Sequence, residues 1–272
     1  MPVFEMSSAK WLVVAVLLVT GTACSPPASE VSISFAAAYN GQPVSCIGNE
    51  SEVQLTDLRF YVHDVNLVAD DGSLQQVSLI PDGIWQDETV ALVDLETGEG
   101  ACLNGTAETH TTIIGHYAGD GFEGVQFAIG VPDDLNHKDP LIAEPPLSYS
   151  VMHWHWASGY KFIRAGIENT DDSVFLHLGS SRCEGTIGDI KGCGSANRPV
   201  VVVGRFDPNT DQVVIDLGTL FQSTDLADGE KSECMSGPAN PACVGPFSQL
   251  GVDHATGESI APAAAFSAGL RR

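Results

Sequence analysis

LTDLRFYVHDVNLV, at positions 55–68, is the stretch that decides the fold, because its apolar, aromatic and β-branched residues are typical of a long strand. The turn sequence DDG follows at 70–72, and VSLI at 77–80 can return beside the first strand. This part of the chain therefore predicts a long strand that is closed by a hairpin turn.

Shorter strand patterns recur along the rest of the chain at a spacing of roughly ten residues. They lie at 31–36, 90–95, 111–115, 124–131, 149–165, 173–178, 200–203 and 212–217. Short helices are expected at 220–226 and 246–250. This pattern predicts an all-β fold, an antiparallel β-sandwich or a barrel-like structure with long loops and few short helices. The irregular, proline-containing run at 132–146 is the longest loop, and a loop of that length is functional or disordered.

The N-terminal residues 1–23 have the pattern of a secretory signal peptide, in which Lys10 precedes the apolar run 11–19 and small residues follow up to Ala23. The run is too short for a comfortable membrane span. Cys24 stands where a bacterial lipoprotein would be cleaved and lipidated, and the alternative is cleavage nearby with a free Cys24. We therefore expect export to the periplasm or cell surface, with membrane attachment only through a lipid anchor.

The remaining sequence divides into three expected parts. Residues 25–30 form a short linker, residues 31–251 form a single β domain, and the Ala/Gly-rich residues 252–272 form a disordered tail.

Six further cysteines are expected to form disulfides, because an even number in an exported chain favours them. Short loops favour Cys183–Cys193 and Cys234–Cys243, which leaves Cys46–Cys102. A zinc or copper–thiolate site is the alternative. It is disfavoured because no C-x-x-C pair is present and the exported compartment is oxidising.

The formal net charge of −23 argues against binding to nucleic acid or to anionic membrane surfaces. A solvated acidic surface accounts for most of it. No nucleophile elbow, zincin helix, phosphate-binding glycine loop or haem-attachment motif occurs in the sequence, so we expect a binding protein and no enzyme. The Asp/Gly-rich segments 70–72 and 119–121 are expected to be turns, because they lack the ligand spacing of a calcium loop.

The run MHWHWASGYKF at 152–162 concentrates residues that can carry chemistry. If it is a strand, Met152, Trp154 and Trp156 share one face, while His153 and His155 share the other and can hold one metal ion. The alternative is that Met and Trp are ordinary core residues and that both histidines lie on the surface.

Two further histidines raise the case for a metal site. His137 lies in the proline-containing loop, and His177 lies at the end of an expected strand. A lone histidine at either place is more often structural. Imidazole together with a thioether, from Met152 or Met235, suits copper and especially Cu(I). These residues therefore favour a metal site, with copper as the ion that suits them and Met152 or Met235 as a weak soft ligand.

A set of motifs in a fixed order resembles the MbnP family of periplasmic copper-binding proteins, also described as the four-Cys member of a metallo-mystery pair, with MopE and CorA as more distant relatives in type. The motifs are Leu-x-x-Phe-Tyr-Val (58–62), Gly-Val-Pro (130–132), Leu-Asn-His-x-Asp-Pro (135–140), Met-x-Trp-x-Trp-x-x-Gly-Tyr-x-Phe (152–162), His-Leu-Gly-Ser (177–180), Asn-Arg-Pro (197–199), Phe-Asp-Pro (206–208) and Cys-Met-Ser-Gly (234–237). The resemblance covers roughly residues 31–251. The four cysteines of that description would match Cys183, Cys193, Cys234 and Cys243.

The resemblance implies a partner, a modified residue and a ligand set. MbnP-like proteins are typically encoded beside a dihaem enzyme of the MauG/cytochrome c peroxidase type, which oxidises a tryptophan to kynurenine, and copper binding depends on that change. Carried over, the modified residue is Trp154 or Trp156, and the copper ligands are His137 and His177. The chain departs from the family pattern at His153 and His155. The alternative function is an exported β-sandwich that binds a protein or carbohydrate, with structural histidines.

Overall fold

A computed structural model of the protein describes Met1 and residues 28–48, 53–186, 188–223 and 232–271. The predicted signal peptide and Cys24 lie outside the described residues. Within the described part, no helix is long and apolar enough to cross a membrane.

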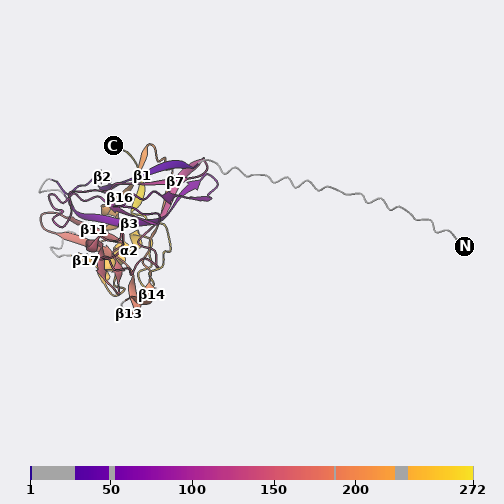
Figure 1. Cartoon of the computed structure of the whole chain (residues 1–272). Helices are drawn as coiled ribbons and strands as arrows, with labels where there is room; N and C mark the ends of the chain where they lie inside the picture. Colours follow the sequence, from indigo (N-terminus) through magenta and orange to yellow (C-terminus); the bar gives the residue numbers. More distant parts are fainter. Residues whose placement is uncertain (2–27, 49–52, 187, 224–231, 272) are drawn as a thin grey trace.

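Two curled sheets make up the body of the molecule, and Figure 1 shows them as the upper and central parts of the fold. The six-stranded sheet contains β1 (Ser29–Tyr39), β2 (Gln42–Pro43), β5 (Ser78–Leu79), β7 (Thr112–Tyr117), β16 (Asp211–Asp216) and β18 (Phe266–Leu270). The eight-stranded sheet contains β3 (Gln54–Ala69), β4 (Leu74–Gln76), β6 (Val90–Asp94), β8 (Phe122–Ile129), β11 (Ile163–Glu168), β12 (Ser173–Leu178), β15 (Val200–Gly204) and β17 (Ser232–Cys234). The predicted all-β sandwich with few helices is confirmed, although β1–β16 and β12–β17 pair in parallel.

Two hairpins and four short helical segments complete the described structure. The hairpins are β9 (His153–His155) with β10 (Gly159–Tyr160), and β13 (Ser181–Thr186) with β14 (Asp189–Ser195). The helical segments are η1 (Ser150–Met152), α1 (Leu217–Leu220), η2 (Pro241–Cys243) and α2 (Val244–Gln249). The β13–β14 hairpin projects at the lower end of the molecule in Figure 1.

The long strand predicted at 55–68 is β3, and it organises the eight-stranded sheet. Its first half pairs with β11 and its second half with β8, while β6 and β4 also pair with it. A return strand, β4, does begin at Leu74, shortly after the DDG turn, but Ser78–Leu79 further along the chain pair with β7 in the other sheet. The predicted two-stranded hairpin is therefore split between the two sheets.

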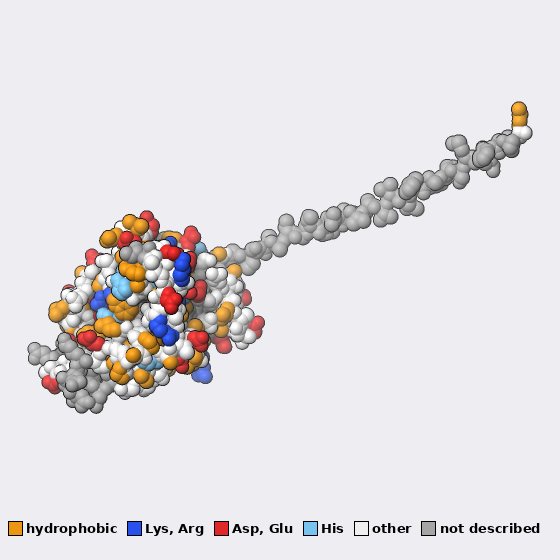
Figure 2. Space-filling view, turned by 90° about the horizontal axis from the view of Figure 1, so that it is seen from below, with side chains coloured by type: hydrophobic (Ala, Val, Ile, Leu, Met, Phe, Trp, Pro, Cys, Tyr) orange, Lys and Arg blue, Asp and Glu red, His pale blue; other side chains and the backbone are white. Residues whose placement is uncertain are grey.

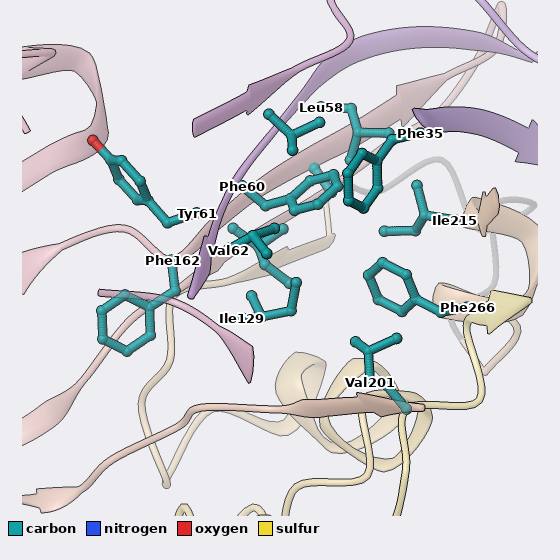
Figure 3. Close-up of a cluster of buried hydrophobic side chains, with 14 of the residues drawn as sticks. Phe35, Leu58, Phe60, Tyr61, Val62, Ile129, Phe162, Val201, Ile215 and Phe266 are labelled. Carbon is teal, nitrogen blue, oxygen red and sulfur yellow. The ribbon is translucent and has the colours of Figure 1, made fainter. Parts of the chain in front are cut away.

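The alternating side chains of β3 separate two interiors. Phe60 faces the sandwich core, where its ring packs edge-to-face against Phe35 of β1 and Phe266 of β18. Tyr61, the next residue, points the other way, and Figure 3 shows its ring apart from the Phe60 cluster. Its hydroxyl donates a hydrogen bond to the Pro146 carbonyl at 3.1 Å. The proline-containing loop thus covers the outer face of β3 at Tyr61, while the sandwich core covers the other face at Phe60, so β3 is buried on both faces.

Two expectations about chain segments are wrong. The tail is not disordered, because β18 pairs with β16 over Asp211–Ile215 and buries Phe266 in the core. The Ala/Gly-rich sequence of β18 carries no alternation of apolar and polar residues that would predict a strand. The linker is shorter than expected, since β1 begins at Ser29 and pairs with β7 from that residue.

The structure contains the three expected disulfides, Cys183–Cys193 and Cys234–Cys243, which the loop lengths favoured, and Cys46–Cys102, which remained. Closing a loop of this kind is expected to stabilise the fold by about 2–4 kcal/mol through the unfolded chain.

Candidate metal centre

The residues 149–165 do not form the single strand that we expected. Met152 ends the one-turn helix η1, His153–His155 form β9, a turn closed by a Ser158 N–H bond to the His155 carbonyl follows, and β10 returns. Met152 is fully buried in the core, whereas Trp156 is 39% exposed. The predicted common face of Met152, Trp154 and Trp156 is therefore wrong, because the chain turns between them.

The proline-containing loop delivers His137 to this hairpin. Asn136, which is fully buried, accepts a hydrogen bond from Tyr160 N–H at 3.1 Å and so ties the loop to β10. His137 Nδ1 lies 3.2 Å from the Trp156 carbonyl oxygen. A carbonyl can only accept, so Nδ1 carries the proton in this bond and Nε2 keeps its lone pair. Metal-ligating histidines are typically fixed in this way.

Burial also keeps His137 in its neutral form. Desolvation lowers the pKa of the ring below its ordinary value, and the bond to Trp156 only partly opposes this. A neutral imidazole is the form that binds a metal ion. The loop therefore presents His137 in a state that is ready to coordinate.

His177 meets the same hairpin through Trp154. The two ring centroids are 6.5 Å apart with the planes at 65°. Burial, with the cations Arg164 and Lys161 nearby, lowers the pKa of His177 to about 4. His177 is therefore neutral at any physiological pH, as a copper ligand must be.

Trp154 lies against the chain just beyond His177. A Cβ at Gly179 would stand 2.8 Å from Cζ3 of the Trp154 ring and 2.7 Å from the Tyr160 carbonyl oxygen. Only glycine leaves room for the indole at this place, so the His-Leu-Gly-Ser motif serves to seat Trp154 beside His177. The predicted ligands His137 and His177 thus contact one hairpin, the first at the Trp156 carbonyl and the second at the Trp154 ring.

His153 and His155 have different surroundings and do not form the pair that strand periodicity suggested. His153 packs edge-to-face on Tyr160 with centroids 5.0 Å apart, and its Nε2 is buried without a hydrogen-bond partner among the described residues. His155 is exposed, with Ala157 N–H and the Ser158 hydroxyl within 3.2 Å of its two ring nitrogens. His155 is therefore satisfied by its own turn, and His153 alone faces inward.

A cavity of about 820 Å³ opens beside the hairpin. His137, His153 and Trp156 line it together with residues of the loop, including Asp139 and the exposed Leu141 and Ile142. Figure 2 shows histidine side chains lying among hydrophobic ones on the face viewed from below. The loop at 132–146, whose length predicted that it is functional or disordered, is the main wall of this cavity.

Sequence reasoning did not foresee how close a disulfide comes to His137. Cys193 Sγ lies 3.4 Å from His137 Nε2, and one ligand atom from each of His137, Cys183 and Cys193 lies within 4.8 Å of the others. The His and the Cys pair are more than forty residues apart in the printed sequence, so no local spacing announces the cluster.

Three comparisons with known proteins bear on this site. The family model named MbnP matches residues 28–236. A search of curated proteins found no match. Among solved structures, MbnP from Methylosinus trichosporium is similar with a TM-score of 0.77 and 26% sequence identity, covering 90% of this chain and 100% of that one.

Proposed function

The chain belongs to the MbnP family, and from this premise we propose that it is an exported copper-binding protein whose site lies at the β9–β10 hairpin. The observation that carries the proposal is that His137 and His177, both held neutral, each contact the β9–β10 hairpin at one of its two tryptophans. Borderline-soft imidazole donors suit copper.

His137 and His177 would supply the two nitrogen ligands. Met152, which the sequence suggested as a third ligand, is fully buried among core side chains and is better explained by packing. Bound copper would bring Lewis-acid or one-electron character to a site in a binding protein. The role of the chain itself is to hold the two imidazoles neutral and oriented.

We infer that Trp154 is the residue converted to kynurenine by the dihaem partner. Trp154 is half-buried and faces His177, whereas Trp156 is exposed and offers its carbonyl, not its ring, to His137. Opening the indole replaces a lone N–H donor with an aryl amine and a ketone, which can coordinate next to His177. The acidic chain, with a net charge of −23, would steer a basic face of the partner in a salt-sensitive association.

The metal site is tested by single substitutions in oxidised, partner-processed protein. His137→Ala and His177→Ala are each expected to weaken copper binding at least tenfold, or about 1.4 kcal/mol. His116→Ala, on an exposed position of β7, is the matched control and is expected to bind copper like the wild type. Full copper affinity in both site variants would move the site elsewhere, with His153 as the next candidate.

The modified residue is tested by peptide mass spectrometry after co-expression with a dihaem partner. Trp154 is expected to gain the mass that corresponds to losing one carbon and acquiring one oxygen. Trp154→Phe should abolish that product, while Trp156→Phe should retain it. Two unmodified tryptophans in copper-replete native protein would contradict the kynurenine proposal and leave the histidine site untouched.

The Cys24 lipid anchor and periplasmic or cell-surface location complete the proposal. Metabolic labelling with a fatty acid, lost in Cys24→Ser, would support the anchor, and unlabelled wild-type protein would contradict it.

A further inference from the structure

We propose that Cys183 and Cys193 form a second, redox-dependent copper site with His137: in the disulfide form the site is closed, and two-electron reduction opens it to Cu(I). The Cys2His site itself does not depend on the proposed function. The competition between the two sites does depend on the proposed function, because His137 would be a ligand both with His177 and with the two cysteines.

The hydrogen bonding of His137 leaves its Nε2 lone pair available to coordinate a metal ion. Nδ1–H donates a hydrogen bond to the Trp156 carbonyl. This orientation of the ring points the Nε2 lone pair toward Cys193 Sγ, 3.4 Å away. The Asn136 amide nitrogen, 3.3 Å away, is the other group near Nε2, and coordination would replace that weak contact. A three-coordinate site with bonds of about 2.3 Å to sulfur needs ligand atoms roughly 4 Å apart. The present spread, within 4.8 Å for all three atoms, meets that need after a side-chain rotation of the cysteines.

The position of this disulfide separates it from the other two. Cys183 and Cys193 are direct cross-strand partners in the β13–β14 hairpin, and both are half-buried. The other four bonded cysteines are each 0–1% exposed. Thiol–disulfide exchange needs access to a sulfur atom, so a reductant reaches the Cys183–Cys193 disulfide before the two buried disulfides.

The surroundings favour thiolates once the bond is opened. Cys193 lines an open depression of about 510 Å³ together with Arg182, Lys191 and Glu184. Lys191 is paired with Asp189 at 2.7 Å, so Arg182 is the cation at this edge that can stabilise a thiolate. The thiolate is the form that binds a metal ion.

The reaction balances as ordinary exchange. A dithiol reductant gives two electrons and two protons to the Cys183–Cys193 bond and becomes a disulfide itself. The two thiols then release two protons as Cu(I) binds to both sulfurs and to neutral His137. Reoxidation by a disulfide of the same chemical class reverses the steps and expels the ion. Because His137 belongs to both sites, reduction of the Cys183–Cys193 disulfide would move copper away from His177 and toward the β13–β14 hairpin.

The first test asks which disulfide opens. The full exported protein is treated with a phosphine, which becomes the phosphine oxide, and free thiols are alkylated and mapped. Cys183 and Cys193 are expected to be labelled before the buried cysteines. Earlier labelling of Cys234 or Cys46 would overturn the proposal.

The second test measures copper–sulfur bonding. Phosphine-reduced protein, desalted without oxygen, is titrated with Cu(I) against a chromophoric chelator, and sulfur ligation is read by X-ray absorption. Reduction is expected to add copper–sulfur bonds and to raise Cu(I) affinity at least tenfold. Cys183→Ser with Cys193→Ser should remove both effects, as should alkylation of the wild-type pair if the double variant does not fold. His137→Ala should lower the gained affinity about tenfold, whereas exposed His116→Ala should not.

The two proposals fail in different ways. In a His177→Ala background, oxidised protein should lose copper while reduced protein keeps its copper–sulfur signal. Absence of sulfur ligation in fully reduced protein, or its survival in the double serine variant, would refute the redox site. Neither outcome alters the copper binding measured in the oxidised wild type.

Discussion

The outer face of β3 at Arg59 and the β9–β10 hairpin both bury polar side chains, but only at Arg59 do the buried charged groups have partners of opposite charge within the fold. Arg59 donates to Asp57 at 2.9 and 2.7 Å and approaches Glu96 at 3.4 Å, and all three residues are at most 5% exposed. Around the hairpin, by contrast, the His137 Nε2 lone pair faces only weak partners and His153 Nε2 has none among the described residues.

The difference separates structural polar groups from candidate ligands. In the Arg59 network each charge has a counter-charge or a backbone donor, and Glu96 also accepts from Gly98 N–H and Thr106 N–H at 2.9 Å. Such a network fixes loops on the sheet. At the hairpin, the unused acceptors are nitrogen atoms of neutral imidazoles, which a soft metal ion can satisfy.

The largest expected effect comes from breaking the Arg59 network. Arg59→Ala leaves Glu96 buried without its counter-charge and leaves Asp57 paired with Arg164 alone, so we expect a loss of about 3–5 kcal/mol in the free energy of unfolding. Lys191→Ala breaks an exposed ion pair with Asp189 and should change the same quantity by less than about 1 kcal/mol. Urea unfolding measures both. Equal effects of the two substitutions would show that the buried network is not structural.

A smaller effect is expected from crowding the same network. A Cβ at Gly105 would lie 1.3 Å from Glu96 Oε2, so Gly105→Ala must displace the carboxylate. We expect a loss of about 3 kcal/mol in stability with unchanged copper affinity. Gly204→Ala is the matched control, since nothing lies within 4 Å of its added methyl group. Reduced copper affinity in a folded Gly105→Ala protein would show that the two regions are coupled.

The smallest effect concerns the pH dependence at the hairpin. The pKa of His177 is about 4 in the folded protein, below its ordinary value of about 6.5, so between these values only the unfolded chain takes up a proton. Stability is therefore lost as the pH falls through that window, by up to roughly 2 kcal/mol near pH 5. His177→Gln should not show this loss.

The comparison with His177→Gln is needed because Asp94 acts in the opposite direction. Burial, with Glu96 nearby, raises the pKa of Asp94 to about 7, so the folded protein holds that proton and gains stability as the pH falls below 7. The free energy of unfolding of wild type and of His177→Gln is measured with urea at pH 7.5 and at pH 5. The difference between the two proteins at each pH gives the contribution of His177, because Asp94 acts equally on both. If wild type and His177→Gln differ in stability by the same amount at pH 7.5 and at pH 5, a half-buried His177 that stays neutral in the folded protein is contradicted.

The sequence by itself determined the strands, the disulfide pairs and the family, because these depend on short-range patterns. Period-two alternation gave β3, β8 and β12 to within a few residues, and loop lengths favoured two of the three disulfides. The same reasoning failed at β18, whose small residues carry no readable alternation, and at 149–165, where a turn interrupts the alternating Met, His and Trp residues.

Only the tertiary structure decided which side chains meet. His137, Trp156 and Cys193 lie on a loop, a turn and a hairpin that are far apart in the chain, and Asn136 joins the first two through Tyr160. The sequence could nominate His137 and His177 but could not distinguish Trp154 from Trp156 or reveal the disulfide beside His137. The reason is physical: short-range backbone preferences fix local elements, whereas the packing of long loops on the outer face of β3 fixes the lone pairs and sulfur atoms that a metal ion would bind.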